Sequence, residues 1–328
     1  MGPRDDSPVA ESVAELLAEA SSREPMKTTD SLSSARFERV VIDGRPHVVK
    51  YLSWDTDWVS RASEDTQCRA LQLWRCGMLA TLPEVFDHTI VGVAYEKASD
   101  TTALLMRDVG QYLVPEGDSA LPLEQHLRFI DHMALLHARF WDWPDPAVTT
   151  PLRVRYTALS AATGRREAAG GGVPALLEAA WQRLVAAEPV AGLLAMKLAA
   201  DPSPLLHGLT SGPQSFIHGD WKAGNLGSLP DGRTVLLDWQ WPGRAPPVVD
   251  LAWYLAVNCD RLPISKHDTI AAYHDALRRY DIVTDGWWER ALALGLLGGF
   301  VQLGWSKTGD ELAWWVDRAL QAAPLLTR

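Results

Sequence analysis

The chain has 328 residues and 47% of them are apolar, enough for one large domain or two of ordinary size. Its net charge of −10, from 31 basic and 41 acidic residues, argues against a sequence-independent nucleic-acid binder, because such proteins carry excess positive charge. No apolar run is long enough to span a membrane, and three cysteines without a Cys-x-x-Cys pair indicate a reduced, cytoplasmic protein. The composition does not indicate an oligomeric state.

The first third of the chain has the pattern of a small antiparallel sheet with one inserted helix. A short amphipathic helix is expected at 9–20, and helical spacing returns at 57–76. Two β-rich runs flank Asp43-Gly44 and predict a hairpin, whose turn should exceed two residues because Pro46 removes one ladder bond. The expected strands are 37–42, 47–52, 84–86, 89–95 and 102–106.

From residue 121 onward the pattern is mainly helical. Apolar residues recur at helical spacing from Leu123 to Phe140, in a long helix that should end near Trp143-Pro144. The Gly/Ala/Arg-rich stretch 161–172 is expected to be a mobile loop. Further helices are predicted at 174–187, 265–280, 286–303 and 309–322, and short strands at 215–217 and 234–237.

The segment 218–239 carries the strongest chemical signal. Asp220 follows an apolar strand, Asn225 comes five residues later, and Asp238 follows another apolar strand. A carboxylate such as Asp220 can orient a hydroxyl for phosphoryl transfer, while the oxygens of Asn225 and Asp238 suit Mg²⁺. Asp, Asn and Gly are common in turns, but their joint spacing with two strands is far more specific than any one of them.

Two basic residues accompany Asp220. Lys222 is either a ligand of the transferring phosphate or an ordinary solvated lysine. His218 is interpreted as holding the catalytic loop rather than as a base. The histidines show no metal-binding spacing. The sequence lacks the phosphate-binding Gly-x-x-x-x-Gly-Lys-Ser/Thr motif and the Gly-x-Ser-x-Gly motif of serine hydrolases.

The segment resembles the aminoglycoside phosphotransferase/choline kinase family, the small-molecule branch of the protein-kinase-like fold. That family carries His-Gly-Asp-x-x-x-x-Asn and then an Asp, matched here by 218–225 and Asp238. Downstream, 243–252 looks like the family's Gly…Asp-Leu-Ala segment, in which Asp250 would support the catalytic loop. Upstream, 135–141 looks like its Leu-His-Ala helix end, so the resemblance spans about 30 to 320.

The resemblance implies an α+β fold with two lobes and the cofactors ATP and Mg²⁺. Residues 1–108 would form the β-rich, nucleotide-binding N-terminal lobe, and 109–328 the larger helical lobe with the catalytic and acceptor sites. Lys50 looks like the strand lysine that binds the α- and β-phosphates. Its expected partner is a helix glutamate, and Glu64 is favoured over Gln67, which occupies the position first expected.

The rest of the nucleotide site is indicated less directly. Without a Gly-x-Gly-x-x-Gly loop, the turn that covers the phosphates is assigned to Ser33 and Ser34. The segment 105–108 would be the hinge between the lobes, with Met106 and Asp108 close to the adenine. The sequence does not distinguish ATP from GTP.

These features predict a kinase that phosphorylates a hydroxyl of a small metabolic or biosynthetic molecule. One alternative is an O-phosphotransferase that inactivates an aminoglycoside or related antibiotic, although the tryptophan-rich C-terminal third suggests a less charged acceptor. Another is a catalytically idle nucleotide-binding or scaffold protein. A protein kinase is disfavoured because only twelve positions separate Asp238 from Asp250, too few for a peptide-binding segment.

Overall fold

The computed structural model describes residues 8–26 and 35–327. The chain divides into two compact units, each formed by two separate stretches of sequence. Unit 1 comprises Met1–Glu116 and Gly224–Gln240, and unit 2 comprises Gly117–Ala223 and Trp241–Arg328. The division into functional lobes at 108/109 stays a prediction. What the structure adds is that the segment 224–240 belongs with the N-terminal residues.

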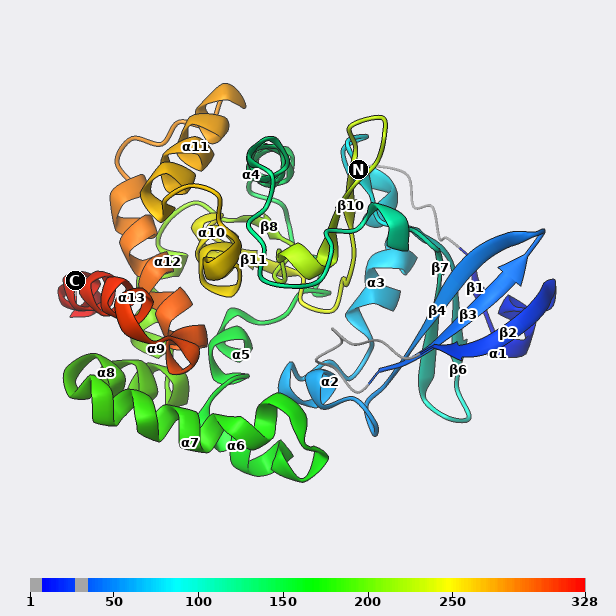
Figure 1. The fold of residues 1–328 in the computed structure, drawn as a ribbon, viewed down its shortest axis with the longest axis horizontal. Coiled ribbons are helices and arrows are strands. Elements are labelled where there is room, and N and C mark those ends of the chain that lie inside the picture. Colours follow the sequence, from blue (N-terminus) through cyan, green and yellow to red (C-terminus); the bar gives the residue numbers. More distant parts are fainter. Residues whose placement is uncertain (1–7, 27–34, 328) are drawn as a thin grey trace. The chain divides into compact units, whose positions relative to one another are not determined.

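Unit 1 is built on a six-stranded sheet (Figure 1). Its strands are β1 (Val9–Ala10), β2 (Ala20–Met26), β3 (Arg36–Ile42), β4 (Arg45–Ser53), β6 (Ile90–Glu96) and β7 (Thr101–Arg107), in the order β1-β6-β7-β4-β3-β2. All neighbours are antiparallel except β1 and β6. The sheet packs its inner face on a cluster of buried side chains that includes Val40, Val49 and Tyr51.

The predicted β3–β4 hairpin is present, but its turn is shorter than expected. Ile42 pairs with Arg45, so Asp43 and Gly44 alone form the turn. Both have a positive φ, 49° and 70°, as a two-residue hairpin turn with the matching twist requires. Pro46 is accommodated within the strand.

The expected helix over 9–20 is mostly wrong. Only α1 (Val13–Leu16) is helical, with Ser12 as its N-cap, and β1 and β2 lie on either side of it. An isolated helix of this length is only marginally stable, so pairing with the neighbouring strands prevails. The helix expected over 57–76 is likewise two short ones, α2 (Trp58–Ala62) and α3 (Arg69–Arg75).

A second, three-stranded sheet completes unit 1 and carries part of the chemical motif. Its strands are β5 (Phe86–Asp87), β9 (Leu226–Ser228) and β10 (Thr234–Leu236), with β10 in the centre. β10 runs parallel to β5 and antiparallel to β9. A small buried cluster of Val109, Leu229 and Val235 packs the β9–β10 hairpin against the N-terminal stretch of unit 1.

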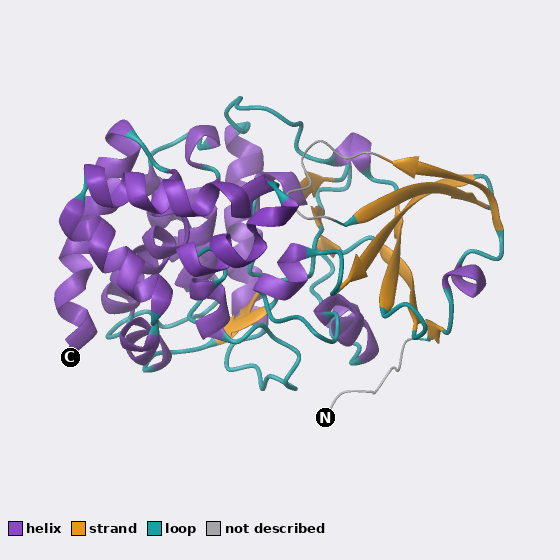
Figure 2. Ribbon diagram, turned by 90° about the horizontal axis from the view of Figure 1, so that it is seen from below, coloured by secondary structure: helices purple, strands orange, loops and turns teal. Residues whose placement is uncertain are grey.

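Unit 2 is mainly helical (Figure 2). Its helices are α4 (Leu123–Arg139), α5 (Leu152–Thr157), α6 (Ala161–Glu167), α7 (Gly172–Ala187), α8 (Pro189–Ala200), α9 (Ser203–Thr210), α10 (Val248–Val257), α11 (Lys266–Arg279), α12 (Trp288–Leu303) and α13 (Gly309–Ala322). The strands β8 (Ser215–Ile217) and β11 (Gly243–Ala245) form an antiparallel pair. Among the described residues, no helix is sufficiently long and apolar to cross a membrane.

The mobile loop expected at 161–172 is wrong, because most of it is α6. Ser160 caps this helix by accepting a hydrogen bond from the amide of Thr163. Gly164 lies so close to Leu177 of α7 that a Cβ atom there would clash with it. The glycine that suggested a loop therefore permits close packing of two helices.

Candidate active site

Lys50 of unit 1 lies near the middle of β4, where the strand alternation turns it away from the core. Val49 and Tyr51 on either side of it point into the buried cluster. The Lys50 ammonium donates to Asp238 Oδ1 at 2.9 Å and to Gln240 Oε1 at 2.6 Å. The lysine is only 6% exposed, and its contact with Gln240 is buried, whereas its contact with Asp238 is part-buried.

Asn225 and Asp238 lie at one end of the β9–β10 hairpin. Leu226 pairs with Leu236, and the amide of Leu237 donates to the Asn225 carbonyl at 2.9 Å. Asp238 follows directly and has a φ of 63°, a left-handed conformation that is uncommon outside glycine and asparagine. The hairpin register therefore brings together the two residues expected to bind the metal ion.

The helix glutamate expected beside Lys50 is not its ion-pair partner, which is Asp238. Glu64 is exposed and lies in the break between α2 and α3, with a φ of 54°. The break is stabilised by Asp65, whose carboxylate accepts hydrogen bonds from the Arg69 amide at 2.9 and 3.0 Å. Asp65 thus bonds the first backbone amide of α3, and the new helix begins there despite the continuous helical pattern of the sequence.

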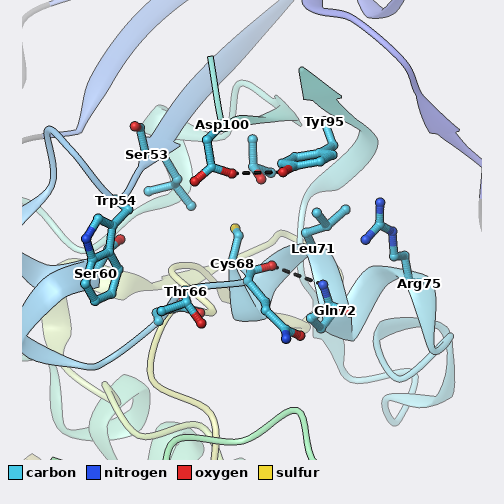
Figure 3. A pocket seen from close by; sticks show the side chains of 14 residues that line it. Ser53, Trp54, Ser60, Thr66, Cys68, Leu71, Gln72, Arg75, Tyr95 and Asp100 are labelled. Carbon is cyan, nitrogen blue, oxygen red and sulfur yellow. Dashed lines mark hydrogen bonds between the residues drawn. The ribbon is translucent and has the colours of Figure 1, made fainter. Parts of the chain in front are cut away.

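Gln67, the alternative partner, lines a pocket of about 280 Å³ within unit 1. Figure 3 shows this pocket, with Cys68 and Gln72 among its labelled side chains. The pocket lies against α3, and the Gln67 carbonyl accepts a hydrogen bond from the Gln72 side chain at 3.0 Å. The Cys68 side chain also lines it, and burial raises the pKa of this thiol to about 12. The thiol is therefore protonated at neutral pH and a poor nucleophile.

The remaining nucleotide-site predictions fall in two places. Ser33 and Ser34 lie outside the described residues. Met106 is half-buried near the end of β7, and Asp108 follows that strand. The Asp108 carboxylate accepts from the Gly110 amide at 3.1 Å and pairs with Arg39 at 3.3 Å. Their role at an adenine stays a prediction.

In unit 2, the loop 218–223 follows β8 and is held by Asp250. The Asp250 carboxylate accepts hydrogen bonds from the His218 amide at 2.8 Å and the Gly219 amide at 2.9 Å. His137 contacts the same carboxylate at 3.3 Å, and Arg155 donates to the Gly219 carbonyl. Asp250 thus bonds two amides of this loop, and its role as the support of a catalytic loop stays a prediction.

The charge of Asp250 is stabilised despite complete burial. Burial alone would raise the pKa of this carboxyl, but the hydrogen bond from His137 and the nearby Arg155 and His218 hold the pKa below its usual value. Arg155 is buried too, and burial lowers the pKa of its guanidinium. Asp250 therefore remains an anion that can accept hydrogen bonds from the loop amides.

Each carboxylate oxygen of Asp220 has a donor within hydrogen-bonding distance. Trp253 Nε1 of α10 donates to Oδ1 at 3.0 Å, and Lys222 Nζ lies 3.0 Å from Oδ2. The Trp253 ring also lies near the Arg155 guanidinium, 5.9 Å from it. Lys222 is thus close to Asp220. His218 is buried, and its Nδ1 atom accepts a hydrogen bond from the Asp220 amide at 3.2 Å. The acid-base roles of these residues stay predictions.

A comparison with models of protein families shows to which family the chain belongs. The model of the phosphotransferase enzyme family matches residues 55–283, more than two thirds of the chain. The chain belongs to this family. No curated protein matches its sequence.

Similar solved structures show that this chain has a protein-kinase-like fold. Choline kinase LicA from Streptococcus pneumoniae is similar with a TM-score of 0.53 and 11% identity, over 96% of each chain. The aminoglycoside phosphotransferase APH(4)-Ia, in a ternary complex with ADP and hygromycin B, gives a TM-score of 0.49 and 14% identity, over 95% of this chain and 96% of that chain. The α+β fold with an antiparallel N-terminal sheet and a helical C-terminal part is confirmed.

The predicted metal site offers donor atoms of the kinds that a magnesium ion accepts. Among the described residues, no group of three His, Cys, Asp or Glu side chains is arranged to hold a metal ion. Asn225 and Asp238 offer one amide and one carboxylate oxygen, which suits an ion that keeps several waters and binds phosphates as well. The residues present are therefore compatible with Mg²⁺ brought by a nucleotide.

Proposed function

We propose that this member of the family transfers the γ-phosphoryl group of ATP, with Mg²⁺, to a hydroxyl of a small molecule. The observation that carries the proposal is the 2.9 Å ion pair between Lys50 and Asp238, which are 188 positions apart. The family resemblance assigns Lys50 to the phosphates, and Asp238 is assigned to the metal ion. Both roles require the two side chains to share one locality.

The reacting hydroxyl is assigned to Asp220. Its carboxylate is held by one donor at each oxygen, and a carboxylate oxygen can accept more than one hydrogen bond. Asp220 can therefore receive the acceptor hydroxyl without losing Trp253 or Lys222. Positioning of this kind supplies much of the catalysis in phosphoryl transfer, and Mg²⁺ would neutralise charge on the phosphates.

The acceptor is proposed to be a small metabolic or biosynthetic alcohol rather than a polycationic antibiotic. A polycation would need unengaged carboxylates, yet Glu311 of the tryptophan-rich region is bound by Lys266 and by the Trp315 indole. The acceptor also has to be small, because the segment between Asp238 and Asp250 is short. Three cysteines that form no disulfide fit a cytoplasmic location.

A screen for ATP consumption tests the activity. The full-length protein with Mg²⁺ and ATP is offered amino alcohols, sugars, nucleosides and aminoglycosides. One class should accelerate ADP release, and an aminoglycoside as that class would favour the resistance alternative. The Asp220→Ala variant should bind ATP normally and lose transfer, because only the hydroxyl-orienting group is removed. Transfer by Asp220→Ala at the wild-type rate would sink the assignment.

Binding of the Mg²⁺–nucleotide is tested separately by calorimetry. Asp238→Ala should abolish Mg²⁺-dependent binding, since it removes the only charged oxygen of the proposed metal site. Asp231→Ala is the matched control, because Asp231 lies in the loop of the same hairpin and hydrogen-bonds with Arg233, two residues further on. Binding by the wild type without acceleration by any acceptor would instead support the idle nucleotide-binding alternative.

A further inference from the structure

Lys50 has a second partner that the phosphate-binding role does not explain. Besides the charged Asp238, it donates to the neutral Oε1 atom of Gln240 at 2.6 Å. Gln240 is 2% exposed and lies two residues after Asp238 in the segment that follows β10. A buried amide at this distance is a firm contact, because an amide withdrawn from water is retained only where its polar atoms are bonded.

The other end of the Gln240 amide faces a buried carboxylate. Its Nε2 atom donates to Asp57 Oδ2 at 3.1 Å. An ammonium can only donate and a carboxylate can only accept, so the two partners together determine the amide orientation. Gln240 therefore connects the negative charge of Asp57 to the positive charge of Lys50.

Asp57 is itself held in place by the start of α2. Its Oδ1 atom accepts from the Val59 amide at 3.1 Å, and its Oδ2 atom accepts from the Ser60 hydroxyl at 3.0 Å. The residue is fully buried and is the N-cap of that helix. The chain of hydrogen bonds thus runs from a helix end through Asp57 and Gln240 to Lys50.

We propose that Gln240 is the positioning residue of Lys50, and that Asp57 determines its orientation. The pair takes the place expected of a helix glutamate, and the inference rests on the proposed role of Lys50 at the nucleotide phosphates. A metal ion would share the Asp238 carboxylate with Lys50, whereas Gln240 holds Lys50 whether or not that ion is bound.

The test is calorimetry of ATP binding with Mg²⁺ to the full-length protein and its variants. Gln240→Leu removes the acceptor for Lys50 and should weaken binding by roughly tenfold, as expected for a hydrogen bond to a charged group. Asp57→Asn keeps a good helix cap but lets the Gln240 amide reverse, so it should weaken binding to a similar extent. The Asp57→Asn/Gln240→Leu double variant should bind ATP no more weakly than Gln240→Leu alone, because both changes interrupt the same series of hydrogen bonds.

The exchanged pair separates a positioning role from a structural one. In the Asp57→Asn/Gln240→Glu double variant, the amide and the carboxylate exchange positions. The carboxylate at position 240 then accepts from Lys50, and the amide at position 57 donates to that carboxylate. Binding should return to within about threefold of the wild type. Ser63→Ala is the control. Ser63 is a buried serine that donates to the Ser60 carbonyl at 3.2 Å and is not one of the residues that link Asp57 to Lys50. It should leave binding unchanged.

The outcomes distinguish this inference from the proposed function. Wild-type affinity in Gln240→Leu, or no recovery in the exchanged pair, overturns the positioning role and leaves the kinase assignment intact. A wild-type protein that binds no nucleotide overturns both. Thermal melting of each variant shows that it is folded, and a loss of affinity with an unchanged melting temperature is the expected result for Asp57→Asn.

Discussion

The Asp220 carboxylate is oriented by its neighbours before any substrate is present. Trp253 contributes a neutral donor from α10, and Lys222 contributes a charged one from the same loop. Orientation matters because an aligning carboxylate acts only when it is within hydrogen-bond reach of the reacting proton. The indole of Trp253 thereby links α10, the helix that also carries Asp250, to the Asp220 carboxylate.

Replacing Trp253 by phenylalanine tests this link. Phenylalanine keeps a ring beside Arg155 but removes the Nε1 donor, so we expect Trp253→Phe to lower kcat about tenfold and to leave ATP affinity unchanged. The rate is measured with the acceptor from the screen. Trp287→Phe removes a donor to the Val283 carbonyl instead and should leave kcat unchanged. Equal rates in all three proteins would show that the indole does not orient Asp220.

Gly219 is required by both conformation and space. Its φ of 84° is left-handed, and a Cβ atom there would overlap the Trp241 carbonyl oxygen and approach Arg155 Nη1 within 2.8 Å. We expect Gly219→Ala to cost on the order of 3 kcal/mol, or roughly 6–12 °C in melting temperature. Gly224→Ala, where a Cβ atom meets nothing within 4 Å, should melt like the wild type. A small shift for Gly219→Ala would mean that the loop relaxes easily.

At the scale of elements, many strands and long helices follow from the sequence, whereas the short helices, the strand β2 and the helix α8 do not. The β3–β4 hairpin and α12 match their predicted patterns closely, because alternation and helical spacing reflect burial directly. The break between α2 and α3 interrupts an unbroken helical pattern. It depends on the bond from the Arg69 amide to Asp65 and on two non-glycine residues, Glu64 and Cys68, with positive φ.

The candidate site divides in the same way. Asn225 and Asp238 could be predicted as site residues because of their joint spacing with the two apolar strands. Arg155, which holds the Gly219 carbonyl, lies 64 positions before it in a short helix with no distinctive pattern. The partner of Lys50 was missed because a local helix glutamate was expected, whereas the contact comes from the distant hairpin. Contacts between distant elements leave no periodic signal in sequence.

Three helices of unit 2 meet at one buried histidine. His126 of α4 contacts the Tyr254 hydroxyl of α10 at 2.8 Å and the Thr269 hydroxyl of α11 at 3.2 Å. Burial lowers the pKa of His126 to about 4, so the folded protein keeps this imidazole neutral. In the unfolded chain the same group takes up a proton below about pH 6.5.

This difference predicts an acid-dependent loss of stability. As the pH falls from about 6.5 to about 4, the unfolded state binds a proton that the folded state does not, so stability decreases with an upper limit of about 3 kcal/mol. His126→Gln retains a donor and an acceptor, and its melting temperature should fall less over this range. His267→Gln, at an exposed position, should keep the wild-type slope. An equal slope in His126→Gln would refute the linkage.

At the scale of the molecule, the chain contributes to unit 1 twice. Its first 116 residues supply the six-stranded sheet, and 224–240 supplies the central and one edge strand of the second sheet. A division made in sequence order cannot detect this, because the two stretches are more than a hundred residues apart. The interleaving has a consequence for the chemistry. Lys50 and its partners Asp238 and Gln240 are all inside one unit.

A fragment of residues 1–116 should therefore not fold stably. Without the hairpin, β5 loses its partner β10, and Val109, Tyr112 and Leu113 lose the apolar cover of Leu229 and Val235. We expect this fragment to show little amide protection in hydrogen exchange. The same fragment joined to 224–240 by a flexible linker should show protected amides in β4 and β7, because buried backbone groups depend on intact packing. Comparable protection in both fragments would mean that the N-terminal sheet is stable alone, and that the hairpin serves only to bring Asp238 and Gln240 to Lys50.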